Sequence, residues 1–216
     1  METKNYTVFL DFDNTITKLD VIDDMLIRFS KDDRWVELEK KWKDGLIGSR
    51  DCLRGQIGGI RITRRDLDQY LSGVGLDTYF KRLMRLFKSK NIKTVILSDN
   101  FDYILKKILK TNGLSRLKTH SNKLKVSKNR LVPYFPSTNK DCARSCGHCK
   151  NRNLSANAGK GSRVVYIGDG LSDACPSKHA DLVFAKDELQ KYLKTKKLPH
   201  IPIKGLKDVY EYFKTI

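Results

Sequence analysis

Four short apolar runs, each followed by polar residues, predict the strands of an α/β sheet. Residues 6–10 are rich in β-branched and aromatic types, and residues 94–97 and 163–167 repeat this composition. A shorter run at residues 182–185 has the same character. Runs of this length without polar alternation are typical of buried strands. We therefore expect these four segments to form the centre of the sheet.

The chain between the first two runs has the apolar spacing that is typical of helices. Apolar residues recur there every three or four positions, and Ser49 and Thr63 each precede such a stretch, as helix N-caps do. A further helix leads into the second run. The expected helices cover residues 20–29, 35–42, 49–57, 63–71 and 79–88.

Beyond the second run the pattern changes again. Residues 103–110 predict a helix. Residues 119–135 alternate between apolar and polar around a turn sequence at residues 127–129, which predicts a β-hairpin. Lys150 lies in a polar stretch that we expect to be a loop, and residues 206–213 predict a closing helix.

Length and composition are those of a globular protein with one core. At 216 residues, of which 39% are hydrophobic, the chain can form one domain with a small insertion. No apolar run approaches the roughly 18 residues that a membrane-spanning helix needs. The first strand begins at residue 6, which leaves no room for a secretory leader, so we expect a cytoplasmic protein.

The charge is strongly positive, because 43 Lys and Arg against 25 Asp and Glu give a net charge of +18. Such an excess favours anionic partners and raises the question of nucleic-acid binding. The cations are spread over many segments, however, and no single basic helix with interleaved aromatic residues stands out. We therefore favour a generally basic surface around a site for phosphate esters over specific nucleic-acid recognition.

The five cysteines are an odd number, which argues against a framework of structural disulfides. Cys142, Cys146 and Cys149 have a spacing that could bind Zn²⁺. Cys175 is the more attractive fourth ligand, and His148 is the less attractive one. Because a full local pattern of four cysteines is absent, packing of the loop or a reversible disulfide is the favoured interpretation, and a structural zinc site is the alternative.

Polar and acidic residues follow three of the apolar runs, where the strand ends of an open α/β sheet hold ligands. Asp11 and Asp13 follow the first run, and such a pair suits a hard cation together with nucleophilic or acid–base chemistry. An acidic pair alone is also a common surface turn. Ser98 follows the second run, and Gly168-Asp169-Gly170-Leu171-Ser172-Asp173 follows the third.

Together with Lys150, these residues form in this order the four-motif signature of the haloacid dehalogenase superfamily, which the chain resembles, within its subfamily IB. The motifs extend from position 11 to 173, so the resemblance covers most of the chain. It implies an α/β fold with a three-layer Rossmann-like core, a mostly parallel sheet, a small helical cap inserted after the first strand and a β-hairpin flap. The core would comprise residues 1–17 and 89–216, and the cap residues 18–88.

The resemblance also implies the chemistry of a Mg²⁺-dependent phosphomonoesterase. By motif position, Asp11 is the nucleophile that forms an aspartyl-phosphate, and Asp13 is the general acid and base. Asn14 replaces the more usual glycine, and asparagine tolerates left-handed backbone geometry. The expected magnesium ligands are Asp11, Asp13 through its backbone carbonyl, Asp169, and Asp173 as a ligand or as its support. The residues expected around the phosphate are Thr15, Ser98, Asp99, Asn100 and Lys150.

The branch within the superfamily is less determined. Asp20 and Arg54 hold the places at which phosphoserine phosphatases grip the amino and carboxyl groups of their substrate. Yet Ser98-Asp99-Asn100-Phe101 departs from the Ser-Gly-Gly of those enzymes. The cysteine-rich segment before Lys150 looks more like phosphocholine/phosphoethanolamine phosphatases and the methionine-salvage group that acts on 2-hydroxy-3-keto-5-methylthiopentenyl-1-phosphate.

The prediction is therefore a phosphatase for a small phosphorylated metabolite, similar to these last two groups, with neither a membrane nor nucleic acid as its partner. A phosphoserine phosphatase is the alternative among enzymes. A nucleic-acid end-processing or RNA-binding protein that uses the basic surface is the alternative of another class, and a steep salt dependence of binding would distinguish it. The leaving group and the oligomeric state do not follow from the sequence.

Overall fold

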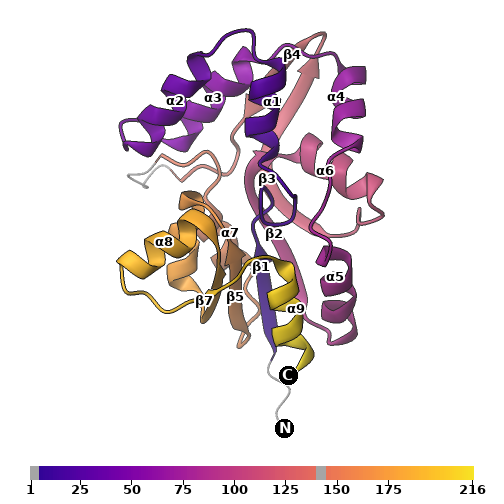
Figure 1. Ribbon diagram of the computed structural model, residues 1–216, viewed down its shortest axis with the longest axis vertical. Coiled ribbons are helices and arrows are strands. Elements are labelled where there is room, and N and C mark those ends of the chain that lie inside the picture. Colours follow the sequence, from indigo (N-terminus) through magenta and orange to yellow (C-terminus); the bar gives the residue numbers. More distant parts are fainter. Residues whose placement is uncertain (1–4, 140–144) are drawn as a thin grey trace.

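The computed structural model describes residues 5–139 and 145–216, and these residues contain one seven-stranded sheet (Figure 1). The strand order is β4-β3-β2-β1-β5-β6-β7. Neighbouring strands are parallel except β3 and β4, which form an antiparallel hairpin. The strands are β1 (Tyr6–Leu10), β2 (Lys93–Phe101), β3 (Lys118–Ser127), β4 (Arg130–Tyr134), β5 (Arg163–Gly168), β6 (Leu182–Ala185) and β7 (Ile201–Pro202).

Helices cover both faces of the sheet and its upper edge (Figure 1). On one face lie α5 (Phe80–Ser89), α6 (Asp102–Thr111) and α9 (Leu206–Lys214), and on the other lie α7 (Lys150–Asn157) and α8 (Asp187–Thr195). The helices above the sheet are α1 (Val21–Phe29), α2 (Arg34–Lys43), α3 (Ser49–Gly59) and α4 (Arg64–Ser72). None of the described helices is long and apolar enough to cross a membrane.

The central strand β1 is buried along its whole length. Val8 and Leu10 belong to the large apolar cluster under α5, α6 and α9, whereas Phe9 packs with Leu154 of α7 and with Tyr166. Alternate side chains of a strand point to opposite faces, so apolar residues at every position suit a strand that helices cover on both sides. The predicted three-layer α/β fold with a mostly parallel sheet is confirmed.

The helices α1–α4 form the cap, which lies above the strand ends (Figure 1). They coincide with the first four helices that the apolar spacing predicts. Asp20 and Thr63 are the N-caps of α1 and α4, and the side chain of each accepts a hydrogen bond from the first turn of its helix. In α3, however, Gly48 is the N-cap, and Ser49 is the first helical residue rather than the predicted cap.

The predicted boundary between cap and core at residue 88 stays a prediction. The helix α5, which ends beside that boundary, packs against α9 and β2. Its apolar side chains, including Phe80 and Phe87, belong to the main core cluster. This helix therefore returns the chain from the cap to the sheet.

The predicted hairpin is present as β3 and β4, with Ser127 paired to Arg130. Lys128 in its turn has a left-handed backbone with φ of 51°. The hairpin reaches up beside the cap, where β4 packs against α3 and Arg130 bridges to Arg61. The flap therefore connects the sheet to the cap.

The segment around Lys150 differs from the sequence prediction. Lys150 is not in a loop but is the first residue of α7. Cys149 is the N-cap, and its sulfur accepts a hydrogen bond from the backbone N–H of Arg152 at 3.5 Å. The polar composition of this helix, which has few apolar residues to reveal its period, explains why the pattern did not indicate it.

Candidate active site

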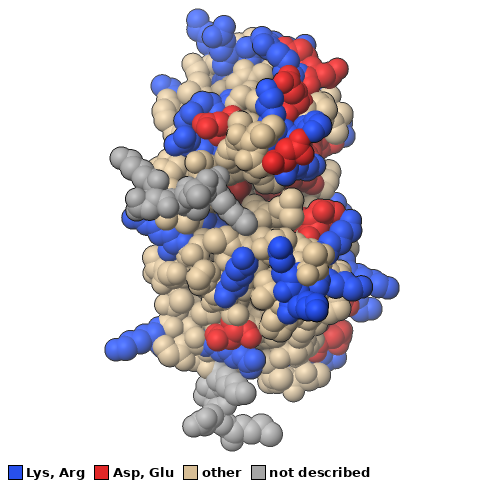
Figure 2. Space-filling view, turned by 90° about the vertical axis from the view of Figure 1, so that its left-hand side faces the viewer, with Lys and Arg blue, Asp and Glu red and all other residues tan. Residues whose placement is uncertain are grey.

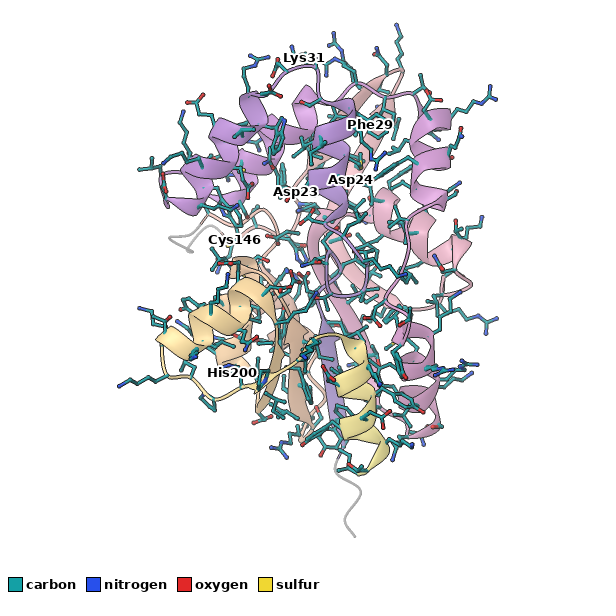
Figure 3. The ribbon with its side chains drawn as sticks, in the orientation of Figure 1. Asp23, Asp24, Phe29, Lys31, Cys146 and His200 are labelled. Atoms are coloured by element: carbon teal, nitrogen blue, oxygen red, sulfur yellow. The ribbon has the colours of Figure 1, made fainter. Side chains whose placement is uncertain are left out.

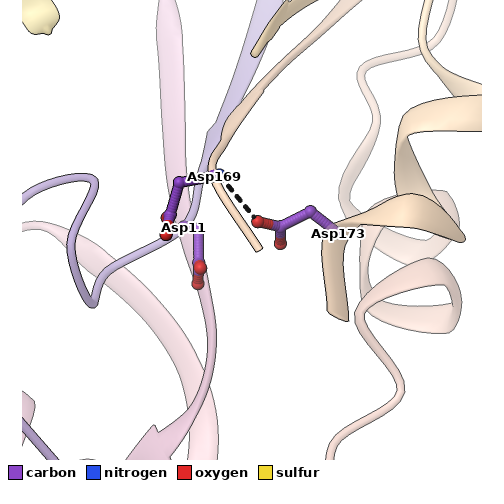
Figure 4. Close-up of side chains that lie close together, drawn as sticks. All are labelled: Asp11, Asp169 and Asp173. Carbon is purple, nitrogen blue, oxygen red and sulfur yellow. Dashed lines mark hydrogen bonds between the residues drawn. The ribbon is translucent and has the colours of Figure 1, made fainter. Parts of the chain in front are cut away.

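Three carboxylates meet at the carboxyl edge of the sheet (Figure 4). Asp11 follows β1, Asp169 follows the neighbouring strand β5, and Asp173 lies in the short 3₁₀ helix Leu171–Ala174. One oxygen of each lies within 4.8 Å of those of the other two. Adjacent parallel strands end at the same edge of a sheet, which is why residues far apart in the chain come together here.

Lys150 is the cation among these carboxylates. Its side chain is only 3% exposed and donates hydrogen bonds to Asp11 Oδ1 at 2.7 Å, to Asp173 Oδ1 at 2.8 Å and to Ser172 Oγ at 3.0 Å. Burial alone favours the neutral amine, but the charges of Asp11 and Asp173 outweigh it and hold the pKa of Lys150 well above its usual value. The ammonium group therefore stays charged next to Asp11.

Asp173 is fully buried, and all its hydrogen-bonding capacity is in use. One oxygen accepts from Lys150 and from the Tyr166 hydroxyl at 2.6 Å. The other accepts from the backbone N–H groups of Asp169 and Gly170, each at 3.1 Å, and the first of these bonds is drawn in Figure 4. This arrangement suits a residue that holds Lys150 and the Asp169 backbone in place. Of the two roles that the motif implies for Asp173, metal ligand or support, these contacts favour support.

The carboxylate of Asp169 is oriented by the loop after β1. Thr15 donates a hydrogen bond to its Oδ1 at 2.5 Å, and the Asn14 side chain donates to its Oδ2 at 3.2 Å. Asn14 has φ of 52°, the left-handed geometry that asparagine tolerates. Asp11 and Asp169 offer carboxylate oxygens within 4.8 Å of one another, which fits Mg²⁺, whereas the Asp13 carbonyl as a further ligand stays a prediction.

Asp13 is held separately from this cluster. Asn100 donates to both of its carboxylate oxygens at 3.0 Å, and the backbone N–H of Val21 donates to Oδ1 at 3.0 Å. Ser98 lies 3.5 Å from Oδ2. Burial, and next the charge of Asp20, raise the pKa of Asp13 to about 8. A carboxyl group that keeps its proton near neutral pH can act as an acid.

Residues at the end of β2 complete the floor of the site. The Ser98 and Asn100 side chains are fully or almost fully buried, and the Asn100 N–H donates to Ser98 Oγ at 3.0 Å. Asp99 lines the cavity together with Ser49 of the cap, and its Oδ1 is a buried oxygen without a partner among the described residues. Burial raises the pKa of Asp99 to about 6.

A cavity of about 130 Å³ lies between these residues and the cap. Asp20, Asp23 and Glu39 line its upper part, and Trp42 provides an aromatic wall. Asp23 and Asp24 project from different sides of α1 (Figure 3), and only Asp23 lines the cavity. In Figure 2, acidic side chains are visible in the hollow between cap and core, while Lys and Arg predominate on the core surface below. The lining residues are Asp11, Asp13, Asp20, Ile22, Asp23, Glu39, Trp42, Ser49, Cys52, Leu53, Gln56, Asp99, Asn100, Lys150 and Ser172.

The two cap residues that match phosphoserine phosphatases have different positions. Asp20 lines the cavity, as a residue that contacts substrate should. Arg54 does not line it: the guanidinium group pairs with Asp51 at 3.1 Å and lies 5.4 Å from the centre of the Phe135 ring. The Arg54 side chain is 58% exposed. Its role in substrate recognition stays a prediction, and the cavity wall lacks its charge.

The described cysteines do not support the zinc hypothesis. Among the residues that the structure describes, the acidic triad is the one group of His, Cys, Asp or Glu donors with metal-ligand spacing. Cys149 caps α7, and Cys146 lies at the lower edge of the cap (Figure 3). Cys175 follows the 3₁₀ helix that carries Asp173. Cys142 lies outside the described residues.

Sequence reasoning missed several residues that the structure brings to the site. Glu39, Trp42 and Asp23 lie on cap helices, and Tyr166 lies inside a strand, so none of them follows a strand end. The helical spacing could have indicated part of this set, because Glu39 and Trp42 are three positions apart on one face of α2. That spacing does not determine which face of α2 is directed toward the core.

Comparisons with known proteins agree with this geometry. The sequence matches the family described as Putative Phosphatase over residues 6–200. It is 27% identical to the 2-hydroxy-3-keto-5-methylthiopentenyl-1-phosphate phosphatase of Geobacillus thermodenitrificans, over 99% of this chain and 97% of that protein. It is 25% identical to Pdp3-interacting factor 1 of Schizosaccharomyces pombe, over 97% of this chain and 95% of that protein.

The fold resembles that of solved phosphoserine phosphatases. A substrate-bound phosphoserine phosphatase complex superposes with a TM-score of 0.74 at 19% identity, over 98% of this chain and 99% of that one. A phospho-aspartyl intermediate analogue of phosphoserine phosphatase gives 0.73 at 19% identity, over 97% and 99%. The family match extends over the whole site, from Asp11 to Asp173. The chain therefore belongs to the putative phosphatase family and is a phosphatase of the haloacid dehalogenase superfamily.

Proposed function

We propose that this phosphatase is a Mg²⁺-dependent phosphomonoesterase that works through an aspartyl-phosphate on Asp11. The observation that carries the proposal is the buried contact of 2.7 Å between Asp11 and Lys150, beside Asp169 and beneath a cavity. A carboxylate that attacks an anionic phosphate needs nearby positive charge, and a fixed ammonium group supplies it. Magnesium, bound by Asp11, the Asp13 carbonyl and Asp169, would neutralise further negative charge.

The steps follow from the positions of the two carboxyl groups. A free oxygen of Asp11 attacks phosphorus, the bond from phosphorus to the leaving oxygen breaks, and protonated Asp13 gives its proton to that oxygen. Asp13 then takes a proton from water, which attacks phosphorus and releases Asp11 and inorganic phosphate. Asn100 and the Val21 N–H hold Asp13 for both proton transfers. Ser98 keeps its proposed role as a donor to a phosphate oxygen, although its side chain is fully buried and does not line the cavity.

The leaving group that best suits the cavity is a small alcohol with a positive charge. Asp20, Asp23 and Glu39 surround its upper part, and Lys150 on the floor is the one Lys or Arg among the described lining residues. The buried Oδ1 of Asp99 has no hydrogen-bond partner among the described residues, so a hydrogen-bond donor on the substrate would satisfy it. Trp42 can stack on an ammonium or quaternary ammonium group. This supports the phosphocholine- and phosphoethanolamine-type part of the sequence prediction.

The two other substrate types fit the cavity less well. A phosphoserine carboxylate would enter a space with three cap carboxylates, while Arg54, which would neutralise it, pairs with Asp51 outside. The relative from Geobacillus thermodenitrificans acts on 2-hydroxy-3-keto-5-methylthiopentenyl-1-phosphate, whose leaving group is uncharged. That substrate gains nothing from the carboxylates, although it is not repelled by them. We therefore propose a cationic alcohol, rather than either of these two types, as the preferred leaving group.

A substrate panel tests the leaving group. With Mg²⁺, we expect phosphocholine and phosphoethanolamine to give higher kcat/KM than glycerol phosphate, and phosphoserine to be poor. Glu39→Gln should lower kcat/KM for the cationic substrates about tenfold, as expected for one lost charge contact, and leave nitrophenyl phosphate almost unchanged. Glu37→Gln is the matched control, because Glu37 lies on the same helix and pairs with Lys41 as Glu39 pairs with Lys43, but it is 68% exposed and does not line the cavity. Efficient turnover of phosphoserine would exclude the cationic preference.

The covalent mechanism has its own test. Asp11→Asn should lower turnover of every substrate by at least about 10³-fold, because the nucleophile is lost. Chelation of divalent cations should stop the wild-type enzyme, and added Mg²⁺ should restore it. A fluoride mimic of phosphate with beryllium should bind the wild type and not the variant. Normal turnover by Asp11→Asn, with deamidation excluded by mass spectrometry, would rule out the aspartyl-phosphate whichever leaving group is preferred.

A further inference from the structure

The helix α5 has a purely cationic outer face. No Asp or Glu occurs between Asp77 and Asp99, so the whole of α5 and the start of β2 are free of acidic residues. The exposed cations of α5 are Lys81, Arg82, Arg85 and Lys88. Its buried side chains are Phe80, Leu83, Met84 and Phe87. The aromatic residues of this helix point into the core. Its outer face therefore carries cations without aromatic residues between them.

None of these four cations forms an ion pair within the described part of the chain. Some cations of other helices do form such pairs. Lys106 of α6 pairs with Asp102, and Lys191 of α8 pairs with Glu188. Arg82 instead lies over the Tyr79 ring, 5.4 Å from its centre, and Lys207 lies 5.9 Å from the same centre on the side of α9.

The spacing of the cations places like charges side by side. Lys81 and Arg85 are four residues apart, and Arg85 and Lys88 are three apart, so they are neighbours on one side of the helix. Like charges in this relation repel one another and destabilise a helix. An anionic partner would reduce that repulsion, and no carboxylate of the described residues forms an ion pair with these cations.

The cationic face is separate from the active site. No residue of α5 lines the cavity, and the helix lies along the face of the sheet beside α9, below the cap (Figure 1). A partner on α5 would therefore leave the entrance to the cavity open. The basic charge on this helix is consequently not part of the phosphate site that the catalytic residues form.

We propose that the outer face of α5 binds the phosphate backbone of a single-stranded nucleic acid, a function beyond phosphomonoester hydrolysis. The cations follow one another along about 10 Å of helix, given a rise of 1.5 Å per residue, which suits a linear polyanion. Two of the four are Arg, which can bind phosphate with two parallel hydrogen bonds. The Tyr79 ring already contacts Arg82, Lys207 and Tyr210, so the proposal rests on the phosphate contacts of the cations and not on base stacking.

An anionic membrane is the less suitable partner. Interfacial helices insert large apolar side chains between lipids. The exposed large apolar residues of the described chain are Ile27, Val36, Leu46, Val132, Tyr134 and Ile216, and none of them belongs to α5. The face of α5 therefore offers charge without an apolar anchor.

Salt-dependent binding of RNA tests the proposal. The full-length protein is titrated into a labelled single-stranded oligouridine of about 20 nucleotides between about 50 and 200 mM salt, and fluorescence anisotropy is followed. With three or four phosphates neutralised, log K should fall with log salt with a slope of about −2 to −3. The triple variant Lys81→Gln/Arg85→Gln/Lys88→Gln should bind more weakly, and its slope should be smaller in magnitude by about 2.

The matched control changes the same net charge on the opposite face of the sheet. Lys191, Lys194 and Lys196, replaced together by Gln, remove three exposed cations from α8 and the residue after it. This variant should retain the wild-type slope, and both variants should retain phosphatase activity, which shows that they are folded. Equal weakening by the two variants would mean that binding follows net charge alone and would overturn the proposal. Binding to phosphatidylserine vesicles without binding to RNA would overturn the choice of partner.

Discussion

The hydroxyl of Ser49, on the first turn of cap helix α3, accepts a hydrogen bond from the backbone N–H of Gly147 at 3.0 Å. Gly147 lies three residues before Lys150, so the cap is attached to the segment that positions the central cation of the site. A second bond, from the Arg50 N–H to the Ser145 carbonyl at 3.3 Å, strengthens this attachment. A side chain at Gly147 would press on Phe135 and on the Arg50 backbone, so the two segments are in close contact.

Ser49→Ala should lower kcat/KM about three- to tenfold through looser positioning of Lys150, because one buried N–H loses its partner. Ser49→Thr, which keeps the hydroxyl, should restore most of the loss. The control is Ser72→Ala, whose hydroxyl bonds only within α4. Steady-state kinetics with nitrophenyl phosphate measure the effect, and wild-type rates in Ser49→Ala would show that the attachment does not influence Lys150.

Lys150→Met should destabilise the fold by about 3–5 kcal/mol near neutral pH, because it leaves Asp11 and Asp173 buried without their cation. Burial, followed by the charge of Asp173, raises the pKa of Asp11 well above its usual value, so protonation of Asp11 removes part of the unpaired charge and the loss should become smaller as the pH is lowered toward 5. Urea unfolding at several pH values measures this. Lys191→Met, which breaks an exposed and solvent-screened pair with Glu188, should leave the stability almost unchanged at any pH. A pH-independent loss in Lys150→Met would contradict the explanation.

Asp13→Asn should slow the hydrolysis of alkyl phosphates far more than that of nitrophenyl phosphate, because nitrophenolate leaves without a proton. The pKa of Asp13 is raised to about 8 by burial and then by Asp20, so the acid form is lost as the pH rises through that region. Wild-type rates for alkyl phosphates in the first half-reaction should therefore decline at alkaline pH, and the variant should lack this decline. Rapid-quench measurement of alcohol release separates this step from hydrolysis of the intermediate.

Asp99→Asn should make the protein more stable while weakening its hold on cationic substrates. Burial raises the pKa of Asp99 from 3.8 to about 6 in the fold, so ionisation costs stability. The cost is absent below about pH 4, grows up to about pH 6 and is constant above it, where it reaches at most about 3 kcal/mol. Thermal unfolding of the two proteins between pH 4 and 8 should show curves that separate in this range. Curves that stay parallel across the range would show that Asp99 is not strained by burial.

Much of the core and of the candidate active site could be predicted from the sequence. The run before Asp11 is apolar at every position, and only a strand with helices on both faces satisfies this. Parallel strands then bring Asp11, Ser98 and Asp169 to one edge, because Asp11 and Asp169 directly follow β1 and β5 and Ser98 lies in the last part of β2. Order and spacing along the chain are sufficient for this inference, since the covalent chain fixes which residue follows which strand.

The tertiary structure decided what faces the cavity and which charges find a partner. Helical spacing shows that a cap helix has two sides, but packing against the neighbouring helices selects Glu39 and Asp23 for the cavity and leaves Arg54 on Phe135 outside. Lys150 lies in a segment without an apolar period, so only its contacts with Asp11 and Asp173 explain its burial. Likewise, only the fold shows that no carboxylate of the described residues forms an ion pair with the cations of α5. These properties depend on distances between segments remote in sequence, which local residue patterns do not contain.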